Sequence, residues 1–307
     1  MDFKEYLDEI MDSSRRLKVA GLQRLSALRR DQADQMGLRW DAMDIRRRRK
    51  LVQELGDLQE DNSDLNFDAV FLLGLKDADP DVRITSVRGL WENESADLID
   101  PLAVLVEGDP DAAVRAEAAL AFGRFVVLSE HGRLGPRHFE KVEAALRSVI
   151  EKPDEVEEVR ARALEAIGAH DAPWVRQAVR EAYESDNLRL KVGAVHAMGR
   201  SCESRWLPLL TKELGSDEAE LRYEAAVACG SLGDEGAVDS LAPLILDEDD
   251  EVRDAAMVAL GEIGGAKARE ALSLMLDSEL VTTREAAAAA LAEIDFEEDP
   301  LGFKVRG

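Results

Sequence analysis

One short pattern recurs seven times along the chain: an apolar residue, a basic residue, and an alanine-rich stretch that closes on a small residue. The clearest copies run from Arg222 to Gly230 and from Arg253 to Gly261. The basic residues, which we call anchors, are Arg83, Arg115, Arg160, Lys191, Arg222, Arg253 and Arg284, at spacings of 32, 45, 31, 31, 31 and 31 residues. A fixed period of this length predicts a solenoid, in which each unit is stable only against its neighbours.

Each copy has the periodicity of an α-helix. Apolar or small residues stand one position before the anchor and three and seven positions after it, so they share one face of a helix. A glycine stands eight positions after most anchors, at Gly123, Gly168, Gly199, Gly230 and Gly261. Because glycine weakens a helix by up to about 1 kcal/mol relative to alanine, we expect close backbone contact there. A second apolar helix follows each copy, so the sequence predicts an all-α solenoid of helix-turn-helix repeats.

The pattern extends towards the N-terminus in weaker form. Residues 17–26 align with residues 190–199, and residues 48–56 make a looser copy, which gives about nine repeats. We therefore expect one solenoid over residues 1–294, with divergent repeats over 1–78 and regular repeats over 79–294. A polar tail over 295–307 follows it.

The charge is strongly acidic and unevenly placed. The net charge of the 307 residues is -25, but residues 1–60 carry 13 basic and 12 acidic residues. The acidic remainder repels phosphate backbones, so nucleic acid is an unfavourable partner and a basic protein or peptide a favourable one. The absence of an apolar run of about 20 residues, together with an acidic start, predicts a cytoplasmic protein without a membrane span. We expect a monomer.

The motif Asp-x-x-Val-Arg-x-x-Ala-x-x-x-Leu-Gly-x-x-Gly, best seen from Asp249 to Gly264, resembles the HEAT repeat in its short bacterial, phycobilisome-lyase-like form. The resemblance implies a right-handed superhelix in which an aspartate–arginine ladder links successive repeats. It assigns Arg83, Arg115, Arg160, Arg222 and Arg253 to this ladder, with acids such as Asp111, Asp217 and Asp250. Lys191 departs from the pattern because it lacks the planar guanidinium.

The sequence offers no catalytic, cofactor-binding or metal-binding constellation. A di-iron hydroxylase of the HEAT family uses His-Glu pairs as ligands, and none of the four histidines precedes a glutamate. Cys202 and Cys229 form no CxxC pair, and Cys229 occupies a core position of the repeat. Bilin lyases and isomerases share the repeat, so a lyase-like activity on a phycobiliprotein is the alternative function.

Aromatic and arginine side chains on second helices are candidate contacts, since such residues anchor many interfaces. The resemblance implies that second helices line the concave face. The candidates there are Trp174, Arg176, Arg180 and Arg205. Trp206 occupies a core position. Trp91, a fifth candidate contact, replaces the glycine eight positions after Arg83 and must either repack its neighbours or reach the surface.

Two irregular segments depart from the repeat. The basic run 46–50 is either a docking site for an acidic partner, RNA or a membrane surface, or a helix whose arginines pair with Asp41, Asp44 and Glu54 and place Arg48 in the ladder. The spacing from Arg115 to Arg160 is 14 residues longer than the usual 31. The extra segment at 124–139 is either a binding loop or a lengthened helical hairpin.

The sequence thus predicts a non-catalytic scaffold that binds a protein or peptide along the concave face of the solenoid. A bilin lyase-like activity is the alternative, and binding of nucleic acid or an acidic partner through residues 46–50 is a third.

Overall fold

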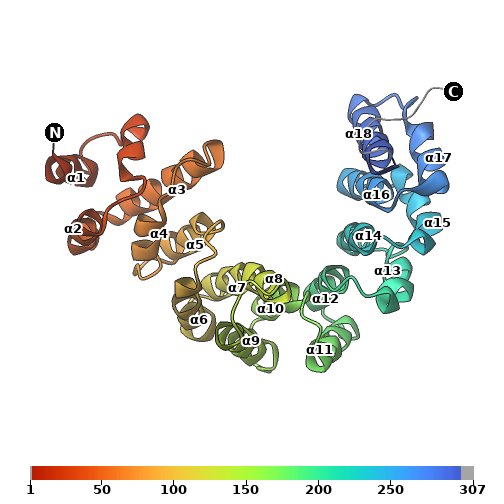
Figure 1. Ribbon diagram of the computed structural model, residues 1–307, viewed down its shortest axis with the longest axis horizontal. Helices are drawn as coiled ribbons and strands as arrows, with labels where there is room; N and C mark the ends of the chain where they lie inside the picture. The colour runs from red at the N-terminus through yellow and green to blue at the C-terminus, as the bar shows by residue number, and fades with distance from the viewer. Residues whose placement is uncertain (1, 299–307) are drawn as a thin grey trace. The chain divides into compact units, whose positions relative to one another are not determined.

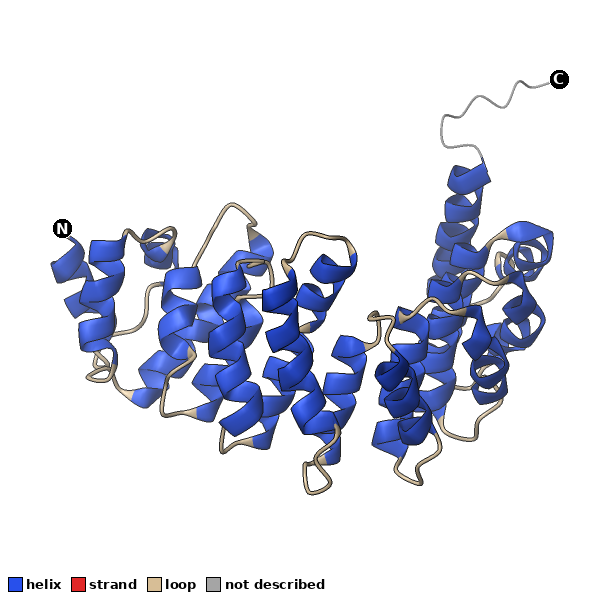
Figure 2. Cartoon of the chain, turned by 60° about the horizontal axis from the view of Figure 1, so that its bottom comes forward, coloured by secondary structure: helices blue, strands red, loops and turns tan. Residues whose placement is uncertain are grey.

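A computed structural model of the protein describes residues 2–298, and these residues form helices joined by turns and loops, without a β-strand (Figure 2). By contacts the chain divides into two compact units, residues 1–163 and 164–307. The architecture is an all-α solenoid, as the repeat predicts.

Unit 1, residues 1–163, alternates helices between two rows. First helices that carry anchors pack side by side, α3 against α5 and α5 against α7, while α2 lies against α4 and α6 against α9 (Figure 1). The helices of this unit are α1 Phe3–Met11, η1 Val19–Leu25, α2 Arg30–Trp40, α3 Ile45–Asp61, α4 Asp68–Gly74, α5 Pro80–Gly89, η2 Ala96–Leu98, α6 Ile99–Gly108, α7 Ala112–Ala121, α8 Gly123–Glu130 and α9 Pro136–Ile150, with α10 Glu157–Ile167 reaching the division.

Unit 2, residues 164–307, repeats one arrangement more regularly. The first helices α12, α14, α16 and α18 pack in sequence, and each also contacts the second helix that precedes it, namely α11, α13, α15 and α17 in turn (Figure 1). The helices are α11 Pro173–Tyr183, α12 Leu188–Arg200, η3 Ser204–Trp206, α13 Leu207–Glu213, α14 Ala219–Leu232, η4 Glu235–Ala237, α15 Val238–Leu241, η5 Ala242–Leu246, α16 Asp250–Ile263, α17 Gly265–Met275 and α18 Val281–Glu298.

The recurrent glycines of unit 2 mark close helix packing, as predicted. A Cβ added at Gly199 would lie 2.7 Å from the Cα of Ala228, and one added at Gly230 would lie 2.9 Å from the Cα of Ala259. Gly168 and Gly261 meet Ala197 and Ala290 in the same way. Each glycine stands eight positions after its anchor and each alanine six positions after the next anchor. We call this recurring contact the glycine–alanine seam.

Acidic N-caps begin many of the first helices. The Asp79 side chain accepts a hydrogen bond from the backbone N–H of Val82, and Asp249 accepts from those of Glu251 and Val252. These bonds satisfy donors that an isolated helix start leaves open. The burial of Trp206 and Cys229, with 2% and 0% of their surfaces exposed, confirms their predicted core positions.

The structure corrects one local expectation and decides between two alternatives for the extra segment. Residues 19–25 form a 3-10 helix with buried Leu22 and Leu25, so the expectation of a first helix over 17–26 is wrong. The extra segment is helical: after α7 ends, a break at Phe122 starts α8, which buries Phe125, Val126 and Leu128. This outcome matches the lengthened helical hairpin.

At the C-terminus, α18 continues to Glu298, and the rest of the predicted tail lies outside the described residues. Within residues 2–298, no helix is both long enough and apolar enough to span a membrane. A single solenoid over 1–294 and its right-handed sense stay predictions.

Candidate functional site

The anchors of unit 1 are joined to the next repeat by buried ion pairs. The Nε and Nη2 atoms of Arg83 lie 2.7 and 2.8 Å from the two carboxylate oxygens of Asp109, and its Nη1 donates to the Asp77 carbonyl. Arg48 pairs with Asp77 at 2.7 Å, and Arg115 pairs with Glu155 at 2.6 Å. All of these carboxylates are buried. Arg160 instead donates to the carbonyl of Ile150 at 3.1 Å.

The anchors of unit 2 follow this scheme only in part. Arg222 makes a two-point contact with Asp247, both distances being 2.8 Å, and these hydrogen bonds hold the pKa of Asp247 below its usual value. Lys191 lies 2.9 Å from Glu213, which also accepts a hydrogen bond from the hydroxyl of Tyr183. Arg253 pairs with Asp250 on its own helix.

Most of the acids that the resemblance assigns to the ladder do not pair with an anchor of a neighbouring repeat, so that assignment is wrong. Asp111 accepts from the N–H of Ala113 as an N-cap, and Asp217 offers only its backbone carbonyl to Arg222. The N-cap carboxylate is occupied by its own helix, whereas the residue six positions before an anchor faces the previous anchor. The sequence signal is the recurring Asp-x-Asp, at Asp77, Asp109 and Asp247, whose first aspartate is the partner.

The predicted contact candidates on second helices lie next to acids or rings of their own unit. Arg176 pairs with Asp171, and Arg205 pairs with Glu203. The guanidinium carbon of Arg180 lies 6.0 Å from the centre of the Trp206 ring. Trp174 lies on α11 and is half-buried. Arg176 also lies 3.9 Å from Glu203, so Glu203 links Arg176 and Arg205, and the binding role of the candidates stays a prediction.

Trp91 reaches the surface, with 58% of its area exposed. Helix α5 ends at Gly89, two residues before it, so the indole stands where the glycine–alanine seam would otherwise continue. It borders a groove of about 220 Å³ between α3 and α5. We call this the Trp91 groove. Its other lining residues are Gln53, Gly56, Asp57, Gln59, Glu60, Thr85, Arg88 and Gly89.

The Trp91 groove contains an unusual buried amide. Gln59 is 6% exposed, and its Nε2 donates to the carbonyl of Gly89 at 3.1 Å. Its Oε1 accepts no hydrogen bond from the described residues. This oxygen is buried, so it is not presented at the surface of the groove. Sequence reasoning found Trp91 as a break in the repeat but had no signal for Gln59.

A second groove continues along the same helices. It has a volume of about 290 Å³, runs across α5, α7 and α10, and includes Ile84, Leu120 and Arg162 in its lining. Arg88 lines both grooves and pairs with Glu117 at 2.7 Å. The two grooves therefore meet at Arg88.

The extra helix α8 touches the loop that carries Trp91. Arg124 donates to the Trp91 carbonyl at 3.4 Å, and its guanidinium lies 4.9 Å from the Phe125 ring. Burial lowers the pKa of Arg124 to about 10. Arg133, just after α8, pairs with Glu94 at 2.5 Å. The two irregular features of the repeat, Trp91 and the extra segment, are thus adjacent.

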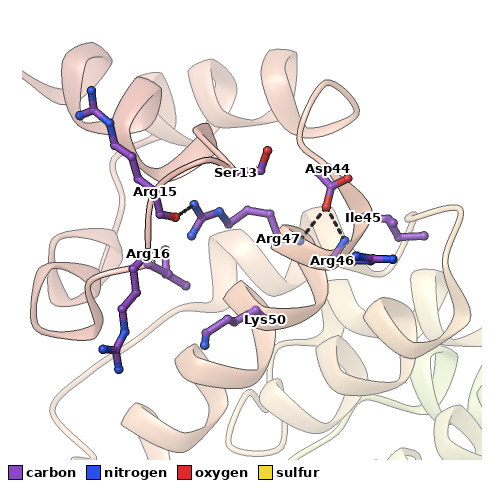
Figure 3. A pocket seen from close by; sticks show the side chains of 9 residues that line it. Ser13, Arg15, Arg16, Asp44, Ile45, Arg46, Arg47 and Lys50 are labelled. Atoms are coloured by element: carbon purple, nitrogen blue, oxygen red, sulfur yellow. Dashed lines mark hydrogen bonds between the residues drawn. The ribbon is translucent and has the colours of Figure 1, made fainter.

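The basic run 46–50 contains arginines that make structural contacts and cations that are exposed. Arg48 takes the ladder position, as one interpretation proposed, and Arg49 pairs with Asp79 and Asp81. Arg47 reaches from α3 to the backbone carbonyls of Asp12 and Arg15, as Figure 3 shows for Arg15. Asp44 binds backbone N–H groups, which corrects its expected pairing with an arginine side chain.

An open groove of about 680 Å³ lies between residues 13–17 and the start of α3 (Figure 3). We call it the basic groove. Its lining contains five cationic side chains, Arg15, Arg16, Arg46, Arg47 and Lys50, and one carboxylate, Asp44.

Other chemistry-bearing side chains stand apart. Within the described part of the chain, no group of three or more His, Cys, Asp or Glu residues has a metal-binding arrangement. The Nδ1 of His196 lies 2.6 Å from Glu224. Burial raises the pKa of Cys229 to about 12, which keeps this thiol protonated and inert.

A family model described as HEAT repeats matches residues 69–148, 140–222 and 207–292, which together exceed half of the chain. The chain belongs to the HEAT-repeat family. This membership accounts for the repeat and for its phycobilisome-lyase-like form. No curated protein matches the sequence significantly.

Solved structures align with most of this chain. The complex of CpcE and CpcF of phycocyanin lyase from Nostoc sp. PCC7120 is 18% identical, with 92% of this chain and 97% of that chain covered and a TM-score of 0.53. Human deoxyhypusine hydroxylase in complex with glycerol is 21% identical, with 86% and 96% covered and a TM-score of 0.38. An engineered protein is 20% identical, with 96% and 79% covered and a TM-score of 0.39. At these identities the likeness concerns the HEAT fold alone.

Proposed function

We propose that this HEAT-repeat protein is a binding scaffold, and that a peptide segment of its partner lies in the Trp91 groove and the groove that continues from it. The observation that carries the proposal is the exposed indole of Trp91, which stands at a position that glycine holds in the regular repeats. A tryptophan so exposed contributes little to its own fold, whereas tryptophan is among the most common energetic anchors of interfaces.

The surroundings of Trp91 support the proposal. The two grooves meet at Arg88 and follow first helices of one unit, so an extended segment has a continuous path across α3, α5 and α7. The exposed indole is an apolar surface that a bound peptide would cover.

The test is replacement of Trp91 by alanine. We expect the affinity for the partner, captured by a photo-crosslinker placed at position 88, to fall about 30-fold, because an anchor tryptophan contributes about 2 kcal/mol or more. The unfolding free energy should change by less than about 0.5 kcal/mol, since the side chain is exposed. Val104→Ala, which alters a 70% exposed residue on α6 of the same unit, is the matched control. Unchanged affinity in Trp91→Ala would contradict the proposal.

A lyase-like activity is the second candidate, favoured by the likeness in fold to the phycocyanin lyase complex over 92% of this chain. No residue of this chain is assigned to such chemistry. Incubation with bilin and an apo-phycobiliprotein tests it. Colour that stays on the phycobiliprotein after denaturation would favour this activity, and its absence beside intact partner binding would favour the scaffold.

A further inference from the structure

The basic groove is a strongly cationic place in an acidic protein. The chain has a net charge of -25, yet five cationic side chains line this groove. Arg15 is paired with Asp12 at 2.9 Å, but Arg16 and Arg46 are exposed and make no ion pair with the described residues, and Lys50 reaches Glu54 only at 3.7 Å. These cations come from both walls, residues 13–17 on one side and α3 on the other. Unneutralised positive charge is therefore concentrated along the groove.

The groove is held open by its own contacts. Arg47 spans the two walls by donating to the carbonyls of Asp12 and Arg15 (Figure 3). The Asp44 carboxylate, which could neutralise the arginines, accepts instead from the backbone N–H groups of Arg46 and Arg47. Because Arg47 is buried and bonded to both carbonyls, its contacts fix the two walls of the groove relative to each other.

A smaller pocket adjoins the basic groove and shares Arg16 and Leu17 with it. It has a volume of about 140 Å³, and its lining includes Tyr6 and Ile10. The hydroxyl of Tyr6 donates to the carbonyl of Gly21 at 2.5 Å, and the guanidinium carbon of Arg24 lies 4.2 Å from the centre of its ring. Glu9, which also lines the pocket, is paired with Lys18 at 2.6 Å. An apolar pocket next to free arginines suits a ligand that combines both characters.

We infer that the basic groove binds an acidic peptide segment of a partner protein, with its carboxylates on Arg16 and Arg46 and one apolar side chain in the pocket beside Tyr6. Arginine binds carboxylates through paired hydrogen bonds. This surface is separate from the Trp91 groove, and the inference does not depend on that groove binding anything.

Two observations favour a peptide over a nucleic acid. Beyond residue 60 the chain carries 26 basic and 52 acidic residues, and a nucleic acid that extends past the groove meets this negative field within about a Debye length of 8–10 Å. A nucleic acid also has no aliphatic side chain for the pocket lined by Ile10 and Leu17. A short acidic peptide places its charges within the basic groove and its apolar side chain in the adjoining pocket.

The test measures fluorescence anisotropy of a labelled short peptide of aspartates and glutamates around one leucine, in low salt where screening is weak. We expect binding to this peptide, and a loss of about tenfold in affinity for each of Arg16→Glu and Arg46→Glu. Arg30→Glu, which reverses an exposed arginine outside the groove lining, should change affinity by less than about twofold. Position 46 lies in the first turn of α3, where a negative charge is favourable, so Arg46→Glu should fold normally.

Two further probes separate the occupants. A peptide with serine in place of leucine should bind about fivefold more weakly, because it leaves the apolar pocket empty. Single-stranded DNA of the same charge should bind more weakly than the leucine peptide. The inference is wrong if the acidic peptide does not bind, if Arg46→Glu binds as tightly as Arg30→Glu, or if the DNA binds more tightly. Trp91→Ala should leave this binding unchanged, so failure here is distinguishable from failure of the proposed scaffold role.

Discussion

Both units use ion pairs between neighbouring repeats, and unit 2 adds a close backbone contact between first helices. In unit 1, Arg48 and the anchors Arg83 and Arg115 each pair with a buried acid of the next repeat. In unit 2 a glycine of each first helix meets an alanine of the next, four times in succession. The glycine–alanine contact brings the C-terminal ends of neighbouring first helices together and leaves no space between them. An ion pair near the N-terminal ends does not by itself bring the C-terminal ends together. The Trp91 groove opens in unit 1, where the seam is missing.

The largest effect is expected from breaking the buried ion pair between Arg83 and Asp109. Asp109→Asn removes the charge that faces Arg83 but keeps an oxygen for the N–H of Asp111. Since both members of the pair are buried, we expect the unfolding free energy to fall by about 3–5 kcal/mol. Urea unfolding followed by circular dichroism measures the change.

The matched control for that prediction lies in unit 2. Asp250, the partner of Arg253, has 86% of its side chain exposed, so Asp250→Asn should cost about 1 kcal/mol or less. Equal effects of the two substitutions would show that buried pairs do not distinguish the units.

A middle-sized effect tests the glycine–alanine seam. A Cβ at position 199 would lie 2.7 Å from a backbone atom of Ala228, so Gly199→Ala should destabilise the protein by about 1–3 kcal/mol. Gly56 in α3 has no atom within 4 Å of an added Cβ, so Gly56→Ala should stabilise by about 0.5–1 kcal/mol. Thermal unfolding of the two variants should shift in opposite directions, and a shared sign would refute close packing as the reason for the recurrent glycine.

The smallest effect extends the inter-repeat ion pair to the last two repeats of unit 2, where it is lacking. Ser278 stands six positions before Arg284, where Asp109 stands before Arg115, and its hydroxyl accepts from the N–H of Leu280. Ser278→Asp should keep this bond and give Arg253 an acid of the next repeat, raising the unfolding free energy by up to about 1 kcal/mol. Ser278→Asn is the uncharged control. A gain that persists when Arg253 is replaced by methionine would show that the new acid acts elsewhere.

The sequence was sufficient to predict the repeat and its core but not the sites. The period located the first helices, the close contact at Gly199 and the burial of Trp206, because these depend on local periodicity. The ladder acids were misassigned because the N-cap Asp111 and the pairing Asp109 look alike in sequence. The Trp91 groove depends on where α5 ends, and the basic groove depends on residues 13–17, which lie outside the regular repeat.

The glycine–alanine seam makes the repeats of unit 2 interchangeable. Gly199 meets Ala228 in the way that Gly230 meets Ala259, so removal or duplication of one 31-residue block would rejoin a glycine to an alanine of the same kind. The array can therefore change in length without new complementary residues at the junction. Trp91 interrupts this modularity, and the region around it cannot be exchanged for a regular repeat without losing its surface.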